Sequence, residues 1–82
     1  MTVEEKLKKM LYNCGMFEDQ VDRVIARFIA ESDESMNGRW REPADAYPDA
    51  LFAALWVNLK DTTLAWIDEN IPQAWFRPIF AQ

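Results

Sequence analysis

The amino-acid sequence predicts an all-α, three-helix domain in which a helical hairpin packs on a long central third helix. Apolar residues recur at helical spacing in three separate stretches, and residues that favour helix ends flank these stretches. No segment alternates apolar and polar residues as a half-buried strand does. Because 82 residues is the length of one domain, we expect residues 1–82 to form a single helical domain.

The first helix is predicted over residues 3–13. Thr2 and Glu5 form a capping-box pattern, in which each side chain satisfies a backbone N–H of the other residue. Gly15 stands where the end of a helix favours glycine. The apolar residues of this stretch are Val3, Leu7, Met10, Leu11 and Cys14.

The second helix is predicted over residues 17–31. Acidic residues occur early in this stretch and arginines occur later, which is the order that the helix dipole favours. The connection to the first helix is short, so the two helices should pack as a hairpin or a corner. The residues that define the apolar face are Phe17, Val21, Val24, Ile25, Phe28 and Ile29.

Residues 32–47 are predicted to form an irregular loop, because they are mostly polar and include Gly38 and Pro43. A loop of this length in a small domain is either functional or held in place by its own side chains. Trp40 and Tyr47 are the residues best suited to hold it.

The third helix is predicted over residues 48–70. Pro48 suits a first helical turn, and the helix should end before Pro72. Its apolar residues cover most of the circumference, so we expect other segments to cover it from more than one direction. They are Leu51, Phe52, Leu55, Trp56, Leu59, Trp66 and Ile67, with Val57 and Leu64 on the far side.

Residues 71–82 form an aromatic tail, with room for one extra helical turn between its prolines. Monomers rarely leave several large aromatic side chains together in water. Two interpretations stay open: a strap that covers the third helix, or an exposed peptide that binds a partner. In the second, the contact residues would be Trp75, Phe76 and Arg77.

Composition limits the classes of function. The net charge of −5 disfavours binding to nucleic acid and favours basic surfaces. A single cysteine cannot form an intramolecular disulfide, which favours a reducing compartment. The N-terminal residues lack the apolar core of a signal peptide, and the longest apolar run, residues 50–57, is too short to cross a membrane. We therefore expect a cytoplasmic protein without membrane contact.

No catalytic site is predicted. The sequence has no histidine, and Cys14 lies on the apolar face of the first predicted helix. A reactive thiolate needs a base or an electropositive site, and histidine is the commonest general base and a common metal ligand. We therefore expect no enzyme activity and no catalytic, cofactor-binding or metal-binding residues.

The predicted loop contains half of a calcium-binding pattern. Asp33, Ser35, Asn37 and Gly38 match the first half of an EF-hand loop, but position twelve is Ala44 in place of the bidentate glutamate. A polar turn with Asn37 and Gly38 at positive φ is the simpler interpretation.

Arg39, Trp40 and Arg41 are the other candidate partner-binding residues. An aromatic side chain between two basic ones could contact an acidic partner or a nucleic-acid base. In the alternative interpretation, Trp40 fills the edge of the core and the arginines pair with Glu42 and Asp45.

Two stretches resemble known groups of proteins. EEKLKKMLYNCGMFEDQVDRVIARF, residues 4–28, resembles the first two helices of ubiquitin-associated domains, with a Cys-Gly-Met-Phe loop in place of Met-Gly-Phe. This resemblance implies a helical hairpin and ubiquitin binding. DENIPQAWFRPIF, residues 68–80, is similar to small uncharacterised proteins of bacteriophages and bacterial mobile elements, which implies a bacterial cytoplasm and, for some of them, binding to a host protein.

The function predicted from the sequence is that of a non-catalytic, acidic protein-interaction module, an accessory protein of a phage or mobile element that binds a host protein. Acidic proteins associate quickly with basic partner surfaces. The alternatives are a self-associating structural homodimer and a weak calcium-binding or nucleic-acid-binding module.

Overall fold

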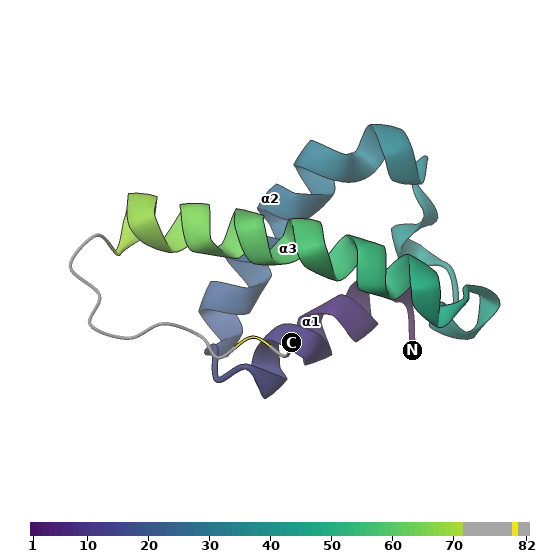
Figure 1. Cartoon of the computed structure of the whole chain (residues 1–82), viewed down its shortest axis with the longest axis horizontal. Helices are drawn as coiled ribbons and strands as arrows, with labels where there is room; N and C mark the ends of the chain where they lie inside the picture. The colour runs from purple at the N-terminus through teal and green to yellow at the C-terminus, as the bar shows by residue number, and fades with distance from the viewer. Residues whose placement is uncertain (72–79, 81–82) are drawn as a thin grey trace.

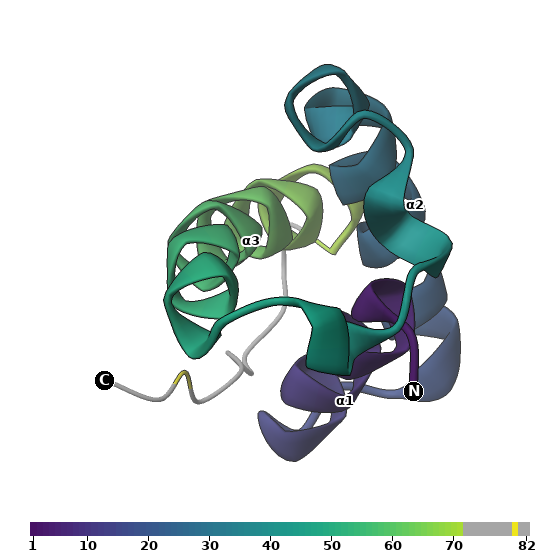
Figure 2. The same ribbon diagram turned by 90° about the vertical axis from the view of Figure 1, so that its right-hand side faces the viewer.

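The computed structural model describes residues 1–71 and residue 80. Helices α1 and α2 pack against each other, and α3 crosses α2 on one side of this pair (Figure 1, Figure 2). No strand occurs in the described residues, and the prediction of an all-α three-helix domain is confirmed. The elements are α1 (Val3–Asn13), α2 (Glu18–Met36), the 3₁₀ turns η1 (Arg39–Arg41) and η2 (Ala44–Ala46), and α3 (Asp49–Asn70).

The start of α1 is fixed by the predicted capping box. The Thr2 N–H donates to Glu5 Oε1 at 2.8 Å, and the Glu5 N–H donates to Thr2 Oγ1 at 3.1 Å. The hydrogen bond from the Thr2 backbone, followed by that from its side chain, lowers the pKa of the Glu5 carboxyl below its ordinary value. The helix bounds agree with the predicted residues 3–13.

The turn from α1 to α2 depends on Gly15. This residue has φ of 93°, a conformation that costs a residue with a side chain about 1–2 kcal/mol. Its N–H donates to the Tyr12 carbonyl at 3.0 Å, and the Met16 N–H reaches the Leu11 carbonyl at 3.4 Å. The pattern is a Schellman motif, and Met16 and Leu11 are both buried, which adds its usual apolar contact.

Helix α2 is longer than predicted, because residues 32–36 continue the helix where the sequence suggested a loop. Met36 lies two turns after Ile29 on the same side of α2, and its side chain is only 4% exposed. Burial of Met36 therefore favours helix through the polar residues before it. The helix ends at Asn37 and Gly38, with φ of 54° and 75°, the positive values predicted for this pair.

The connection from α2 to α3 is held by two aromatic side chains, as predicted. Trp40 is 4% exposed and lies edge-on to Phe28, with ring centroids 5.8 Å apart. Its Nε1–H donates to Asp33 Oδ1 at 3.0 Å. Tyr47 is half-buried against the core, and its hydroxyl donates to the Glu42 carboxylate, which raises the pKa of Tyr47.

The same connection pairs with the first residues of the chain. The Val3 N–H donates to the Glu42 carbonyl at 2.9 Å, and the Ala44 N–H donates to the Met1 carbonyl at 2.8 Å. These two hydrogen bonds form an isolated antiparallel bridge. The bridge places η2 next to the start of α1.

Helix α3 buries one face and exposes the other. Val57 and Leu64 are 56% and 38% exposed. The expectation that other segments cover α3 from several directions is therefore met on the hairpin side but not at these two residues. The reason is that the hairpin presents a single surface, which removes from water only the side chains that face it. The buried or half-buried apolar residues are Leu51, Phe52, Leu55, Trp56, Leu59, Trp66 and Ile67.

Phe80 is the tail residue beyond Ile71 that the structure describes. It is half-buried, and its ring lies edge-on to Trp56 with centroids 5.6 Å apart. At this residue the tail packs against α3, as the strap interpretation requires. Trp75, Phe76 and Arg77 lie outside the described residues, so their contact with a partner stays a prediction.

A polar cluster joins α2 to the second half of α3. Arg27 binds the Glu69 carboxylate through both oxygens, with Nη1–Oε2 and Nη2–Oε1 distances of 2.5 and 3.3 Å. Glu31 accepts from Arg27 Nε at 3.4 Å and from Thr62 Oγ1 at 3.1 Å. Because these side chains are at the surface, we expect the cluster to fix the crossing of the helices more than it stabilises the fold.

Replacing Trp40 should show how much the core depends on it. Trp40→Ala removes a buried indole, so we expect a loss of about 3–5 kcal/mol in the free energy of unfolding, measured by urea denaturation. Trp40→Phe keeps a ring but loses the hydrogen bond to Asp33, and the loss should be smaller, about 1–2 kcal/mol. A Trp40→Ala protein as stable as the wild type would contradict this account of the α2–α3 connection.

Candidate functional site

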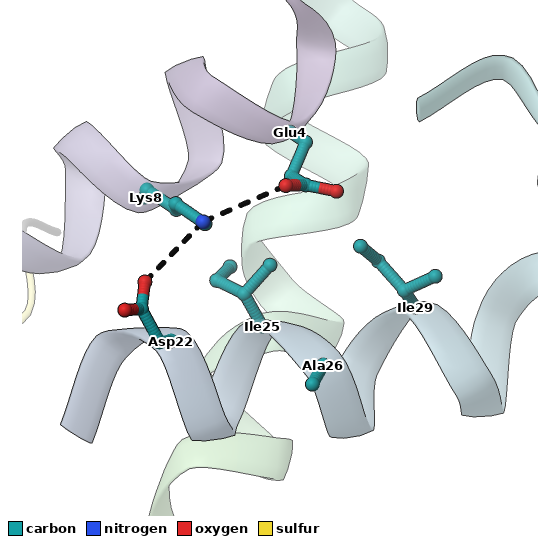
Figure 3. Close-up of a pocket in the computed structure, with 6 residues that line it drawn as sticks. All are labelled: Glu4, Lys8, Asp22, Ile25, Ala26 and Ile29. Atoms are coloured by element: carbon teal, nitrogen blue, oxygen red, sulfur yellow. Dashed lines mark ion pairs between the residues drawn. The ribbon is translucent and has the colours of Figure 1, made fainter. Parts of the chain in front are cut away.

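A depression of about 350 Å³ lies between α1 and α2 and is called the α1–α2 groove below (Figure 3). The residues from α1 are spaced i, i+4, and those from α2 are spaced i, i+3, i+4, i+7, so each set lies on one face of its helix. In Figure 3, α3 runs behind both helices. The lining residues are Glu4, Lys8, Asp22, Ile25, Ala26 and Ile29.

The charged part of the groove is an ammonium group held between two carboxylates. Lys8 Nζ lies 3.5 Å from Glu4 Oε2 and 3.3 Å from Asp22 Oδ1. Burial lowers the pKa of Lys8, but the hydrogen bonds and charges of Asp22 and Glu4 outweigh this effect and raise the pKa above its ordinary value of 10.5. Lys8 therefore stays charged at neutral pH and ties α1 to α2.

The floor of the groove is apolar. Ile25 is 1% exposed, Ile29 is half-buried, and Ala26 is exposed. A methyl group is the smallest side chain that an L-residue carries, so the floor is low at Ala26. A larger side chain at this position would fill part of the groove.

The chemistry of the groove suits recognition better than bond breaking. A lysine that acts as a nucleophile or base must lose its proton near neutral pH, whereas the ion pairs of Lys8 with Asp22 and Glu4 favour its charged form. Within the part of the chain that the structure describes, no group of three or more His, Cys, Asp or Glu side chains is placed to hold a metal ion. An apolar floor next to fixed charges is suited to an amphipathic ligand.

The residues predicted from the sequence to bind a partner lie elsewhere. Trp40 is in the core, as in the alternative interpretation of this tripeptide, while Arg39 and Arg41 are exposed on η1. The fold thus buries Trp40 and leaves the side chains of Arg39 and Arg41 accessible to a partner.

The calcium-like pattern adopts a different structure. Asp33 and Ser35 lie two residues apart on α2, so their side chains point to opposite sides of the helix. The Asp33 carboxylate accepts from the Trp40 indole, and the Ser35 hydroxyl donates to the Ser32 carbonyl at 2.9 Å. The oxygen atoms that an EF-hand loop would direct at one ion do not converge here.

The groove was not predicted from the sequence. Helical spacing placed Ile25 and Ile29 on the apolar face of α2. The available signal was the small residue Ala26 directly after Ile25, with the acidic residue Asp22 one turn earlier. Only the packing of α1 against α2 brings Lys8 to Asp22.

Comparisons with protein-family models, curated proteins and solved structures gave no significant match. The resemblances to ubiquitin-associated domains and to phage-encoded proteins therefore stay predictions, and the function must be argued from the geometry. Among the helices of residues 1–71, none combines the length and the apolar character needed to cross a membrane.

Removing the Asp22 charge should lower the pKa of Lys8. The folded-state pKa of Lys8 is raised, so its ion pairs stabilise the fold fully below the ordinary lysine pKa and cease to do so as the pH rises through the folded value. In Asp22→Asn, NMR titration of the Lys8 side chain should give a lower pKa than in the wild type. Asp19→Asn, which removes an exposed acid outside the groove, is the matched control. An unchanged Lys8 pKa in Asp22→Asn would show that the Lys8–Asp22 pair does not form.

Proposed function

We propose that this chain is a non-catalytic protein-interaction domain that contacts its partner through the α1–α2 groove. The observation that supports this function is the apolar floor formed by Ile25, Ala26 and Ile29 beside the Glu4–Lys8–Asp22 ion pairs. Aliphatic contact supplies affinity, and charges at the rim of an interface supply orientation and association rate. Arg39 and Arg41 on η1 and the aromatic tail are additional candidate contacts.

The biological setting that fits this function is an accessory protein of a phage or mobile element that binds a bacterial host protein. This setting is supported by the resemblance of the C-terminal residues to such proteins and by the net charge of −5. A small acidic domain reaches a basic surface of a larger protein quickly, because long-range attraction speeds the encounter.

Filling the groove should prevent partner binding. Ala26→Leu replaces a methyl group on the groove floor with an isobutyl group, so capture of a specific partner from bacterial lysate should fall about tenfold or more, measured by quantitative mass spectrometry. Ala30→Leu is the matched control, since Ala30 is also exposed, lies one turn later on α2 and does not line the groove. Equal capture by the wild type and both variants would contradict the proposed contact surface.

A second candidate function is that of a self-associating structural protein. Val57 and Leu64 are exposed seven residues apart on the outer face of α3, which is the spacing of a seam between two packed helices. A two-fold pairing of this face would remove both residues from water in each copy.

Light scattering distinguishes the two candidates. If the outer face of α3 pairs, the mass should be twice 9.6 kDa, and the double variant Val57→Glu, Leu64→Glu should return it to that of one chain. The exposed positions should tolerate these changes without loss of the helical circular dichroism signal. A wild-type mass of 9.6 kDa at all concentrations would exclude the homodimer.

A further inference from the structure

We infer that the α1–α2 groove takes a basic amphipathic segment of a partner protein, with an aliphatic side chain on the isoleucine floor and an arginine at the Glu4 and Asp22 carboxylates. The inference rests on the proposed function and adds the chemistry of the partner. It is carried by the charge balance of the groove, the carboxylate oxygen atoms that Lys8 does not use, and the volume and apolar lining of the groove.

The charge balance favours a cationic ligand. Glu4, Lys8 and Asp22 together carry a net charge of −1, and the whole chain carries −5. Side-chain exposures of 33% for Glu4 and 52% for Asp22 show that both carboxylates are accessible from solvent, while Lys8, at 28%, is the least exposed of the three. An approaching ligand therefore meets the negative groups first.

The two carboxylates retain acceptor capacity. Lys8 pairs with Glu4 Oε2 and Asp22 Oδ1, and within the described residues no ion pair of Glu4 Oε1 or Asp22 Oδ2 is found. A guanidinium group carries five N–H donors in one plane, so it can bind a carboxylate oxygen that lysine leaves open. A phosphate or an acidic peptide would instead be repelled by both acids while reaching only the partly covered Lys8.

The floor fits an aliphatic side chain. A volume of about 350 Å³ is at the lower end of ligand pockets and accommodates one or two side chains of a docked segment. Ile29 is half-buried and Ala26 is exposed, so both have apolar surface left to bury. A second copy of this chain is the less favourable occupant, because it would bring another net charge of −5 to an acidic rim.

The test uses a pair of synthetic peptides and the full chain. One capped helical peptide carries leucines with arginines one turn away, and the matched peptide has glutamate at each arginine position. In NMR titrations we expect the arginine peptide to shift the amides of Asp22, Ala26 and Ile29 saturably, and the glutamate peptide to leave them unchanged. Binding should weaken with added salt, because the attraction is screened.

Variants separate the contributions of shape and charge. Ala26→Leu should weaken binding of the arginine peptide about tenfold or more, while Ala30→Leu should bind as the wild type does. Glu4→Gln and Asp22→Asn should each weaken it roughly two- to fivefold, the effect of one exposed ion pair. Spectra of the free variants that match the wild type away from the substituted residue would show that their fold is retained.

Several outcomes would overturn this inference. They are equal or tighter binding of the glutamate peptide, no groove shifts with either peptide, and concentration-dependent groove shifts without peptide, which would identify a second copy as the occupant. Failure of the proposed function is distinguishable. The lysate experiment could yield a partner that binds the wild type but not Ala26→Leu and that presents an acidic segment. This result would support the interaction function and contradict only the basic character of the partner.

Discussion

The fold depends on the burial of Trp40. Its indole fills the space beside Phe28 and is hydrogen-bonded to Asp33, so the residues that follow α2 are drawn back onto the core. From there the chain pairs with the N-terminal residues and enters α3 at a fixed place. Without this contact, the connection would depend on Tyr47 and on the bridge to the first residues, and the start of α3 would be less firmly positioned against the hairpin.

The groove follows from the packing that surrounds it. The Schellman motif at Gly15 reverses the chain tightly, and the buried residues of α1 and α2 then set the distance between the two helices. Lys8 of α1 spans that distance to Asp22 of α2, and Glu4, one turn earlier on α1, binds the same ammonium group. A recognition surface between two well-packed helices is already formed before a ligand arrives, which reduces the entropy lost on binding.

Local signals explain which parts of the fold were predictable. The capping box and Gly15 define α1 within a few residues of sequence, and its bounds were predicted correctly. The end of α2 was placed too early, because residues 32–35 are polar and the burial of Met36 depends on contacts with distant parts of the chain. Val57 and Leu64 are apolar in sequence, yet their exposure is decided by which side of α3 meets the hairpin. The groove was least predictable, since Lys8 and Asp22 meet only after the chain has turned.

The antiparallel bridge between the first residues and the α2–α3 connection joins segments about forty residues apart. Closing a chain loop of that size costs roughly 3 kcal/mol in entropy, more than its two backbone hydrogen bonds return at about 1 kcal/mol each. We therefore expect the bridge to form late in folding, after helix packing has brought both segments together. It forms as a result of the helix packing and does not drive it. In native-state hydrogen exchange, the Val3 and Ala44 amides would therefore lose protection before those at the centre of α2.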